Sequence, residues 1–442
     1  MFEPVLTRGI GTLNLTDLHV YEDQGGYQAL HRAVHDMSPG DVVHEVIASG
    51  LRGRGGAGFP TGRKWTFLPD DGRPRYLVCN ADESEPGTFS NRMLIEKHPH
   101  QLLEGVLLAA YAIRAARSFI YIRGEMKRGY DMLIQALDEA RARGYVGEHI
   151  LGTDFSQEIV VHRGAGAYIC GEETALLDSL EGKRGEPWLR PPFPAGRGLY
   201  GMPTIINNVE TLSSLPHILG KGAAWYRSLG SEKSAGPKIF SVSGQVANPG
   251  NYELPLGTTL RQVIETAGGL LPRRRFKAAQ PGGGSAPLLV EKHLDTPMDF
   301  ESVAAAGSML GTAGVIVYDD SICLVKAAQV MAAFYANESC SQCTPCRVGT
   351  QRILDILTRM TRGRGREEDL DALEELSWGV KMASLCGLGQ TAPNLVLSAL
   401  RHFRWEFEEH VRSRARSCPA DVCWPRGRRP ENRHAAARGY QP

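Results

Sequence analysis

The sequence predicts a multi-domain α/β protein made of a parallel-sheet domain, a small α+β unit and a C-terminal helical bundle. Three observations lead to this prediction. Strand-like runs alternate with helical patterns from Arg75 to Leu180. At Lys238 the pattern changes to short strands separated by Gly- and Pro-rich loops. From Ile322 the residues have the amphipathic spacing of helices almost throughout.

The chain of 442 residues is too long for one hydrophobic core. The changes of pattern divide it into residues 1–237 with an N-terminal arm, residues 238–320, residues 321–413, and a basic tail at 414–442 that we expect to be disordered or to act as a docking arm.

Composition and charge narrow the class of protein. The chain is 42% hydrophobic and 22% charged, as soluble globular proteins are, and its net charge of +1 gives no global field for nucleic acid. Its longest apolar run, Val106 to Ile113, is too short to span a bilayer, and Met1 to Tyr21 lacks a signal-peptide pattern. Nine cysteines, clustered at one place, fit metal ligation in a reducing compartment. We therefore expect a cytoplasmic protein that docks on a larger assembly.

The parallel sheet is predicted from three strand–helix repeats, which follow a helix at Asp41–Ser49. Ligands of such sheets bind beyond the carboxyl ends of the strands. The predicted strands are Tyr76–Asn80, Phe119–Arg123 and Gln157–His162, and the helices are His98–Ile113, Met126–Arg143 and Glu172–Leu180.

Two polar loops follow strands of this sheet and should meet at one edge. Asn80–Gly87 comes after the first strand. Arg163–Thr174 comes after the third, and its glycines enter a helix whose N-terminal N–H groups can hold an anion. The alternative is that an acidic residue such as Glu172 only caps that helix. Together, the two loops predict a binding site.

The loop Gly53–Gly62 contains G-x-G-x-x-G. In a dinucleotide fingerprint this motif follows a strand and begins a helix, which is not the pattern here. A helix precedes it, and its proline and last glycine prevent a long helix directly after it. We expect its backbone N–H groups to approach a phosphate or a flat ring, with Lys64 as counter-charge. Phe59 and Phe67 flank it and could stack on an aromatic base. The alternative is a flexible loop.

Two later segments could complete a binding site. Lys183–Pro203 is rich in Pro, Gly and Arg and could cover a cofactor, with Phe193 as its contact residue. Asn207 and Asn208 begin a predicted helix that runs to about Leu219. Their amides could cap that helix or bind phosphate.

The small α+β unit is predicted from short strands and one helix. Its turn Pro281–Gly284 could bind a ligand, but a surface turn is favoured. The predicted strands are Lys238–Ser243, Phe276–Gln280 and Gly314–Tyr318, and the helix is Thr259–Thr266.

The C-terminal bundle contains a cysteine motif with metal-ligand spacing. Cys340, Cys343 and Cys346 are spaced C-x₂-C-x₂-C, which suits an iron–sulfur cluster or zinc. We expect Cys386 as the fourth ligand, because the first and third connections of an up-and-down bundle lie at the same end. Spacing alone does not distinguish the two metals. The predicted helices are Ile322–Glu338, Val348–Thr361, Glu368–Ala383 and Pro393–Val411.

The other cysteines have no predicted ligand role. Cys323 should lie at the opposite end of the first bundle helix, and Cys418 and Cys423 fall in the Arg-rich tail. Cys79 and Cys170 have the pattern of small packing residues.

Four long strings resemble one family, the NADH-binding flavoprotein subunit of respiratory complex I. The resemblance runs from about residue 20 to about residue 413. It implies a Rossmann-like FMN- and NADH-binding domain, a ubiquitin-like SLBB domain and a four-helix bundle with a 4Fe–4S cluster. The choice of an iron–sulfur cluster over zinc depends on this resemblance. The strings are Gly53–Gly62 (GRGGAGFPTG), Asn80–Gly87 (NADESEPG), Gly164–Leu176 (GAGAYICGEETAL) and Glu338–Gly349 (ESCSQCTPCRVG).

The resemblance also implies site residues, position by position. It implies no acid–base residue, since FMN does the chemistry, and gives Glu85 a positioning role near the nicotinamide. The cluster ligands are Cys340, Cys343, Cys346 and Cys386. The NADH contacts are Phe59, Phe67, Glu85, Glu173 and Phe193. The FMN contacts are Gly53, Arg54, Gly55, Gly56, Ala57, Gly58, Lys64, Asn80, Asp82, Gly164, Gly166, Tyr168, Gly171, Glu172, Asn207 and Asn208.

The implied function is the NADH dehydrogenase module of complex I. A hydride passes from NADH to FMN, and single electrons pass to the cluster and on towards quinone. The implied partners are a thioredoxin-like 2Fe–2S subunit and a large iron–sulfur subunit, at the cytoplasmic face of the inner membrane. One alternative is the diaphorase subunit of an NAD-dependent formate dehydrogenase or NAD-reducing hydrogenase. A more distant one is a non-enzymatic nucleotide-binding module with structural zinc.

Overall fold

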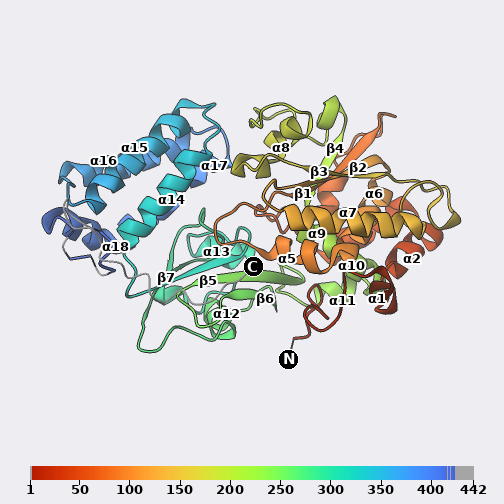
Figure 1. The fold of residues 1–442 in the computed structure, drawn as a ribbon, viewed down its shortest axis with the longest axis horizontal. Helices are drawn as coiled ribbons and strands as arrows, with labels where there is room; N and C mark the ends of the chain where they lie inside the picture. Colours follow the sequence, from red (N-terminus) through yellow and green to blue (C-terminus); the bar gives the residue numbers. More distant parts are fainter. Residues whose placement is uncertain (1, 416, 419, 424–442) are drawn as a thin grey trace.

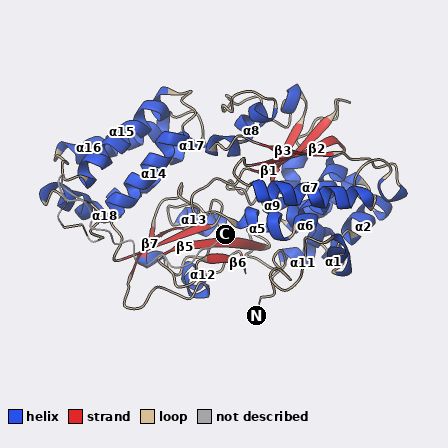
Figure 2. Cartoon of the chain, viewed as in Figure 1, coloured by secondary structure: helices blue, strands red, loops and turns tan. Residues whose placement is uncertain are grey.

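The computed structural model describes residues 2–415, 417–418 and 420–423. The chain folds into an α/β unit, a second unit with a five-stranded sheet, and a helical bundle. In Figures 1 and 2 the bundle lies at one end of the molecule and the α/β unit at the other, with the five-stranded sheet along the lower side. The α/β fold class and its three parts are therefore as expected.

The first sheet is parallel and has the strand order β3-β2-β1-β4. The carboxyl ends of all four strands therefore meet at one edge. The fourth strand was not predicted, because its five residues end in two asparagines that indicated only a helix start. The strands are β1 (Arg75–Ala81), β2 (Ala115–Ile122), β3 (Ile159–Arg163) and β4 (Thr204–Asn208).

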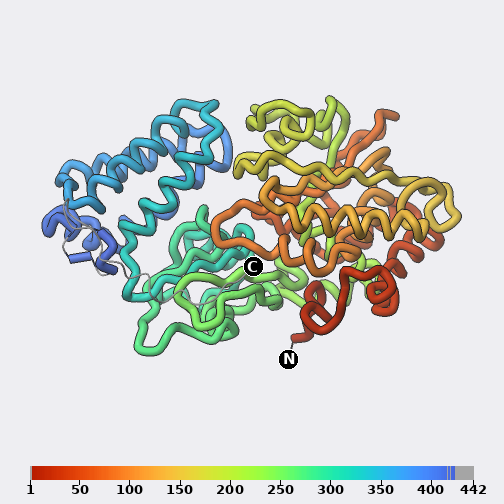
Figure 3. The backbone as a smooth tube through the Cα atoms, viewed as in Figure 1, coloured from red at the N-terminus to blue at the C-terminus, as the bar shows by residue number. Residues whose placement is uncertain are grey.

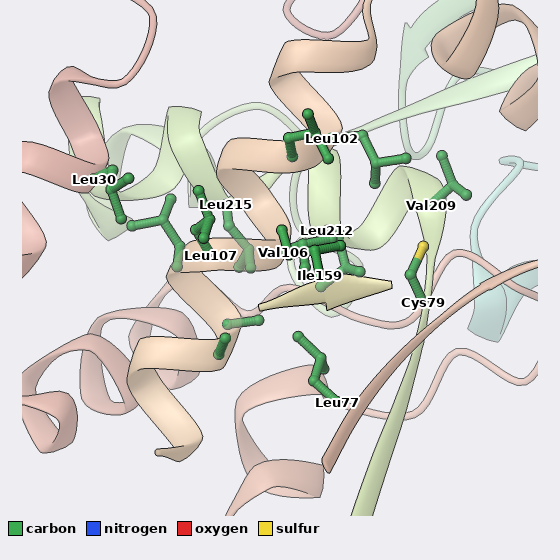
Figure 4. Packing of buried hydrophobic residues seen from close by; sticks show 14 of the residues in the cluster. Leu30, Leu77, Cys79, Leu102, Val106, Leu107, Ile159, Val209, Leu212 and Leu215 are labelled. Carbon is green, nitrogen blue, oxygen red and sulfur yellow. The ribbon is translucent and has the colours of Figure 1, made fainter. Parts of the chain in front are cut away.

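The core of this unit lies between the sheet and an apolar helix. Helix α6 (Pro99–Ile113) buries every residue except Tyr111. Figure 4 shows Val106 of α6 packed near Leu212, with Leu77 of β1 in the same cluster. Fully burying one such side chain stabilises the fold by about 1.5–3 kcal/mol, so this layer holds the sheet in place.

The other helices of the α/β unit surround this core. The helix expected at Asn207–Leu219 is divided in two, and α5 and α6 meet at His98. They are α1 (Leu18–Asp23), α2 (Gln28–Asp36), α3 (Pro39–Ser49), α4 (Thr61–Trp65), α5 (Ser90–Lys97), α7 (Lys127–Ala142), α8 (Glu173–Leu180), α9 (Val209–Ser213), α10 (Leu215–Lys221) and α11 (Ala223–Arg227).

The second sheet has the order β6-β5-β9-β7-β8 and mixes parallel and antiparallel pairs. The strands β6 and β8 were not predicted. The elements are β5 (Pro237–Gly244), β6 (Gly250–Pro255), β7 (Phe276–Gln280), β8 (Leu289–Val290) and β9 (Gly314–Asp319), with helices α12 (Leu260–Thr266) and α13 (Phe300–Ala305).

The turn Pro281–Gly284 is buried, so the expectation of a surface turn is wrong. The Gly284 N–H donates to the carbonyl of Pro86 at 2.9 Å. A Cβ added at Gly283 would lie 2.5 Å from Cγ of Glu85, so the absent side chain lets the two units approach.

The C-terminal unit is a four-helix bundle with one added short helix. Neighbouring helices pack along their lengths, and the first also packs against the last, as the tube in Figure 3 shows. Among the described residues no helix is both long and apolar enough to cross a bilayer. The helices are α14 (Leu324–Glu338), α15 (Thr344–Thr361), α16 (Glu368–Ala383), α17 (Gly387–Thr391) and α18 (Asn394–Arg412).

The chain beyond α18 turns back onto the bundle. Ala415 and Cys423 are buried in the same core cluster as Leu324 and Phe407. These two residues of the predicted tail are therefore packed on the bundle. Residues 416, 419 and 424–442 of the predicted tail lie outside the described residues.

Candidate functional site

The loops after β1 and β3 meet at the carboxyl edge of the first sheet, as predicted. The Asn80 Nδ2 group donates to the carbonyl of Gly171 at 2.9 Å. A Cβ at Gly171 would lie 3.4 Å from Oδ2 of Asp82. A Cβ at Gly164 would lie 2.4 Å from the Tyr121 hydroxyl oxygen, and one at Gly166 would lie 2.4 Å from Oε2 of Glu125. The glycines let the backbone come close to this edge.

Asp82 is a buried carboxyl group at the centre of this edge. Its Oδ2 accepts from Ser84 Oγ at 2.7 Å, while its Oδ1 has no hydrogen-bond partner among the described residues. Burial raises the pKa of Asp82 to about 7, and the nearby charges of Glu125 and Glu338 act in the same direction. A buried polar oxygen without a partner suits a ligand that brings a donor.

The loop Gly53–Gly62 connects α3 to α4 and lies against β4. A Cβ at Gly55 would lie 3.0 Å from Cβ of Asn208, and one at Gly58 would meet the ring of Phe300 at 2.5 Å. Gly56, with φ of +135°, has open space where a side chain would be. Its backbone is therefore free to be approached by a ligand, whereas Gly55 and Gly58 are needed for packing.

Arg54 anchors the loop from inside the protein. Its Nη2 donates to the carbonyl of Ala235 at 2.7 Å and to the hydroxyl of Tyr226 at 3.1 Å. Its backbone N–H donates to Thr211 Oγ1 at 2.8 Å. Nη2 of the guanidinium group predicted as a flavin contact thus holds the loop, while its Nε and Nη1 are buried without a hydrogen-bond partner among the described residues.

Charged groups at the start of α8 are paired with one another. Lys64 forms an ion pair with Glu173 and donates to the carbonyl of Ile206 at 2.8 Å. Glu172 is the N-cap of α8 and accepts from two backbone N–H groups of its first turn, while also pairing with Arg190. The capping alternative is therefore realised for Glu172.

Asn207 and Asn208 end β4, beside β1. Asn207 Oδ1 accepts from Trp65 Nε1 at 2.9 Å. Asn208 Oδ1 caps α9 through the Glu210 N–H at 2.9 Å, and its Nδ2 donates to Asn91 Oδ1 at 2.5 Å. The fourth strand thus carries both amides to the edge that Asp82 occupies.

Glu85 lies where the three units of the chain meet. Its Oε2 accepts from the Tyr168 hydroxyl and its Oε1 from the Ser285 N–H, each at 2.7 Å. Burial raises the pKa of Glu85. Tyr168 in turn donates its N–H to Oε2 of Glu338, the last residue of α14, at 2.9 Å. Fixed hydrogen bonds therefore connect the sheet edge to the end of the bundle.

Three predicted aromatic contacts are exposed. Phe59, Phe67 and Phe193 have exposed fractions of 44%, 53% and 58%. The rings of Phe59 and Phe67 lie 5.8 Å apart at 50°. Exposed aromatic rings are suited to stacking on a flat base.

Cys340, Cys343, Cys346 and Cys386 pack against one hydrophobic cluster at the same end of the bundle. Cys386 is the N-cap of α17, and Cys346 lies in the first turn of α15. Burial raises the pKa of Cys346 to about 11, and the thiols of the other three add to this effect. A metal centre would instead hold these sulfurs as thiolates. The donor set fits an iron–sulfur cluster.

The cysteine loop is also attached to the α/β unit. The Arg184 Nη2 group donates to the carbonyl of Cys340 at 2.9 Å. A Cβ at Gly389 would lie 2.3 Å from Ser384 Oγ and 3.2 Å from Cβ of Cys346, so glycine there lets α17 approach.

Sequence reasoning did not single out Glu338, Ser285 or Arg190. Glu338 stands two residues before Cys340, so an acidic residue beside a metal motif was a usable signal. Ser285 and Arg190 carry no sequence signal, because their roles arise from contacts between distant segments.

Comparison with known families covers all three units. Residues 46–217 match the Nuo51 FMN-binding domain, residues 239–288 the SLBB domain, and residues 326–410 the NADH-ubiquinone oxidoreductase-F iron–sulfur binding region. The fold and site thus define a flavoprotein with an FMN-binding domain and a 4Fe–4S binding region.

Curated relatives specify the family. The F 2 subunit of the NADH-quinone oxidoreductase of Rhizobium meliloti (strain 1021) is 52% identical over 421 residues, covering 95% of this chain and all of the relative. The corresponding F subunit of Escherichia coli (strain K12) is 46% identical, covering 89% of this chain and 90% of the relative. The chain belongs to the family of NADH-quinone oxidoreductase F subunits, which confirms the resemblance.

Hydrogenase proteins are also similar. The NADP-reducing hydrogenase subunit HndC of Solidesulfovibrio fructosivorans is 45% identical, covering 95% of this chain and 85% of the relative. A crystal structure of an NAD⁺-reducing [NiFe]-hydrogenase in the H₂-reduced state has a TM-score of 0.81 and 39% identity, covering 92% of this chain and 67% of that chain.

Proposed function

We propose that this chain is the NADH dehydrogenase module of a respiratory complex I. It binds NADH beside FMN, and electrons leave through a 4Fe–4S cluster to partner subunits and quinone. The observation that carries the proposal is the contact between Tyr168 and Glu338. It joins the carboxyl edge of the flavin-type sheet directly to the helix that leads into Cys340.

The residues around the sheet edge fit FMN. Gly56 leaves its backbone open, and Asp82 offers a buried oxygen without a partner among the described residues. FMN, when bound, takes a hydride as an electron pair and releases electrons singly. The proposed contacts are Gly53, Gly55, Gly56, Ala57, Gly58, Lys64, Asn80, Asp82, Gly164, Gly166, Tyr168, Gly171, Glu172, Asn207 and Asn208, with Arg54 holding the loop from behind.

NADH is held by side chains that orient it and move no proton. The exposed rings of Phe59, Phe67 and Phe193 provide stacking surface for the adenine. Glu85 and Glu173 position the rest of the nucleotide. The Tyr168 hydroxyl and the Ser285 N–H fix the Glu85 carboxylate, so its position is set before NADH arrives.

We propose Cys340, Cys343, Cys346 and Cys386 as the cluster ligands. The relatives are named as subunits, so this chain functions in a multi-subunit assembly. The proposed partners are a thioredoxin-like 2Fe–2S subunit and a large iron–sulfur subunit. The assembly would place the chain at the cytoplasmic face of the inner membrane.

A second candidate is the diaphorase subunit of an NAD-linked hydrogenase or formate dehydrogenase. The similarity to HndC and to the NAD⁺-reducing hydrogenase favours it. The subunits that purify with the chain distinguish the two functions.

Anaerobic titration of the purified chain with NADH tests the proposal. We expect a flavin absorption band that bleaches with NADH, the EPR signal of a reduced 4Fe–4S cluster at low temperature, and reduction of a one-electron dye. A colourless protein that contains zinc at the cluster cysteines would contradict the proposal.

A further inference from the structure

A second group of metal-type ligands lies at the opposite end of α14 from Cys340. It consists of Cys323, His410, Cys418 and Cys423, whose ligand atoms all lie within 4.8 Å of one another. Cys323 Sγ is 3.8 Å from Cys423 Sγ and 3.3 Å from His410 Nε2. In a tetrahedral zinc site with Zn–S of about 2.3 Å and Zn–N of about 2.0 Å, the ligand atoms are about 3.5–3.8 Å apart. The spacing therefore fits one ion.

The four ligands come from three separate segments of the chain. Cys323 precedes α14, His410 is in the last turn of α18, and Cys418 and Cys423 lie beyond it with the spacing C-x₄-C. We searched the described residues for groups of three or more His, Cys, Asp or Glu side chains whose ligand atoms all lie within 4.8 Å of one another. This quartet is the group that meets that criterion. An ion bound by all four would link these segments, so that its binding free energy would add to the stability of the fold.

His410 is oriented as a metal ligand. Its Nδ1 lies 2.7 Å from the backbone carbonyl of Glu406. Because a carbonyl only accepts, Nδ1 carries a proton, and in the neutral imidazole, the form that binds a metal, the lone pair is on Nε2, the atom that faces Cys323. Zinc-binding histidines are fixed in the same way by their second nitrogen.

Cys323 is fixed in position by the helix that it begins. It is the N-cap of the 15-residue helix α14, and its Sγ accepts from the Lys326 N–H at 3.4 Å. This hydrogen bond holds the sulfur at the point where it faces His410 and Cys423.

The site is enclosed by the bundle. Cys323, His410 and Cys423 are buried, and Cys418 is half-buried. Two buried thiols and an imidazole in contact contribute little stability alone, since thiols are weak donors and acceptors. A bound ion would give each of them a strong partner.

We propose that Cys323, His410, Cys418 and Cys423 bind one zinc ion that fastens Cys418 and Cys423, beyond α18, to the end of the bundle. Zinc has no redox chemistry, and α14 separates this site from Cys340 by about 22 Å at 1.5 Å per residue. The ion is therefore structural and separate from electron transfer, and the proposal does not depend on the function proposed above.

Metal analysis of the full chain, purified anaerobically with its flavin and iron–sulfur groups, tests this proposal. We expect about one zinc ion per chain besides the cluster iron, and an X-ray absorption shell of three sulfurs and one nitrogen. Cys423→Ser and His410→Gln should each lose the zinc and keep the iron. Two controls should keep both metals: Asp421→Asn, an exposed change in the same loop, and Cys79→Ala, at a buried cysteine of β1.

Wild-type protein without zinc, or with a disulfide among Cys323, Cys418 and Cys423 in its mass spectrum, would overturn the proposal. Zinc retained in both ligand variants would also do so. If the variants do not fold, Co²⁺ exchange into wild-type protein replaces them as the test. Thiolate-to-cobalt absorption with tetrahedral bands supports the site, and its absence rejects it.

Discussion

The two ends of α14 both gather cysteines, yet the arrangements differ. At the far end, Cys323 and its partners have ligand atoms within 4.8 Å of one another. At the other end, Cys340, Cys343, Cys346 and Cys386 pack against a hydrophobic cluster. The first group suits the single ion proposed above, while the second includes the C-x₂-C-x₂-C spacing of an iron–sulfur motif. The segments from which the cysteines come therefore separate two groups that a count of cysteines cannot.

Their surroundings differ as well. The end at Cys340 touches the α/β unit through Arg184 and Glu338, close to Asp82. The end at Cys323 is closed by the bundle itself and by the returning chain. A centre that exchanges electrons needs neighbours on another unit, whereas a structural ion needs enclosure.

The largest expected effect is at the end of α14 that leads into Cys340, which we call the redox end. Cys386→Ser should abolish the low-temperature EPR signal of the cluster and lower the iron content, because a serine oxygen is a poor replacement for the fourth thiolate. FMN should stay bound, and the proposed zinc should remain. EPR and elemental analysis of the same sample measure all of this.

Cys79→Ala is the matched control, since Cys79 is buried in β1 away from the bundle cysteines. A full EPR signal with unaltered g-values in Cys386→Ser would exclude Cys386 as a ligand.

At the far end, around Cys323, loss of a ligand should lower the stability of the bundle. Cys423→Ser should destabilise the bundle by on the order of 4 kcal/mol, as loss of a structural metal ligand does. The cluster signal should persist, because α14 separates the two centres. Thermal unfolding of the zinc-loaded chain is the measurement, with Asp421→Asn as the control. Equal melting temperatures for the two variants would contradict a fastening role.

The sequence predicted the redox end better than the far end, for a physical reason. Three thiols within seven residues must lie near one another whatever the fold, and the bundle topology then brought Cys386 to them. Cys323 and Cys423 are a hundred residues apart and carry no local signal, so only the packed chain brings them into contact.

The same distinction applies to the sheet. The apolar runs of β1, β2 and β3 identified those strands, while β4 ended in asparagines that also begin a helix. The contact of Glu85 with Ser285 joins residues 200 positions apart, so local pattern could not show that the turn Pro281–Gly284 is buried.

A buried ion pair beside the far end gives the next effect. Lys277 on β7 pairs with Glu406, which is 1% exposed and also accepts from the Leu324 N–H at 3.1 Å. Lys277→Met leaves a buried charge unpaired and should cost about 3 kcal/mol. Arg275→Met, at the solvent-screened pair with Asp320, should leave stability nearly unchanged. Similar urea midpoints for the two variants would show that the Lys277 pair is not important for stability.

A pH effect should appear at the carboxyl edge of the first sheet, close to the Cys340 end of the bundle. The pKa of Asp82 is raised to about 7 by burial, above its ordinary value of 3.8. Between these two values the folded chain keeps a proton that the unfolded chain loses, so stability falls as pH rises through this window. Asp82→Asn should reduce the difference between the free energies of unfolding at pH 5 and pH 8, measured by urea titration, by on the order of 2 kcal/mol. Asp71→Asn, at an exposed carboxyl whose pKa is lowered, should leave that difference unchanged.

The smallest expected effect concerns nucleotide affinity at Glu85. Glu85→Gln keeps an acceptor for the Ser285 N–H but removes the charge, so affinity for NADH or NAD⁺ should change several-fold, about 1 kcal/mol, with FMN still bound. Calorimetry with both nucleotides measures it, and Glu148→Gln, at an exposed position, is the control. If both affinities stayed the same, Glu85 would serve only to join the units of the chain through Tyr168 and Ser285. The stability of that contact, rather than nucleotide binding, would then explain why a carboxylate is buried there.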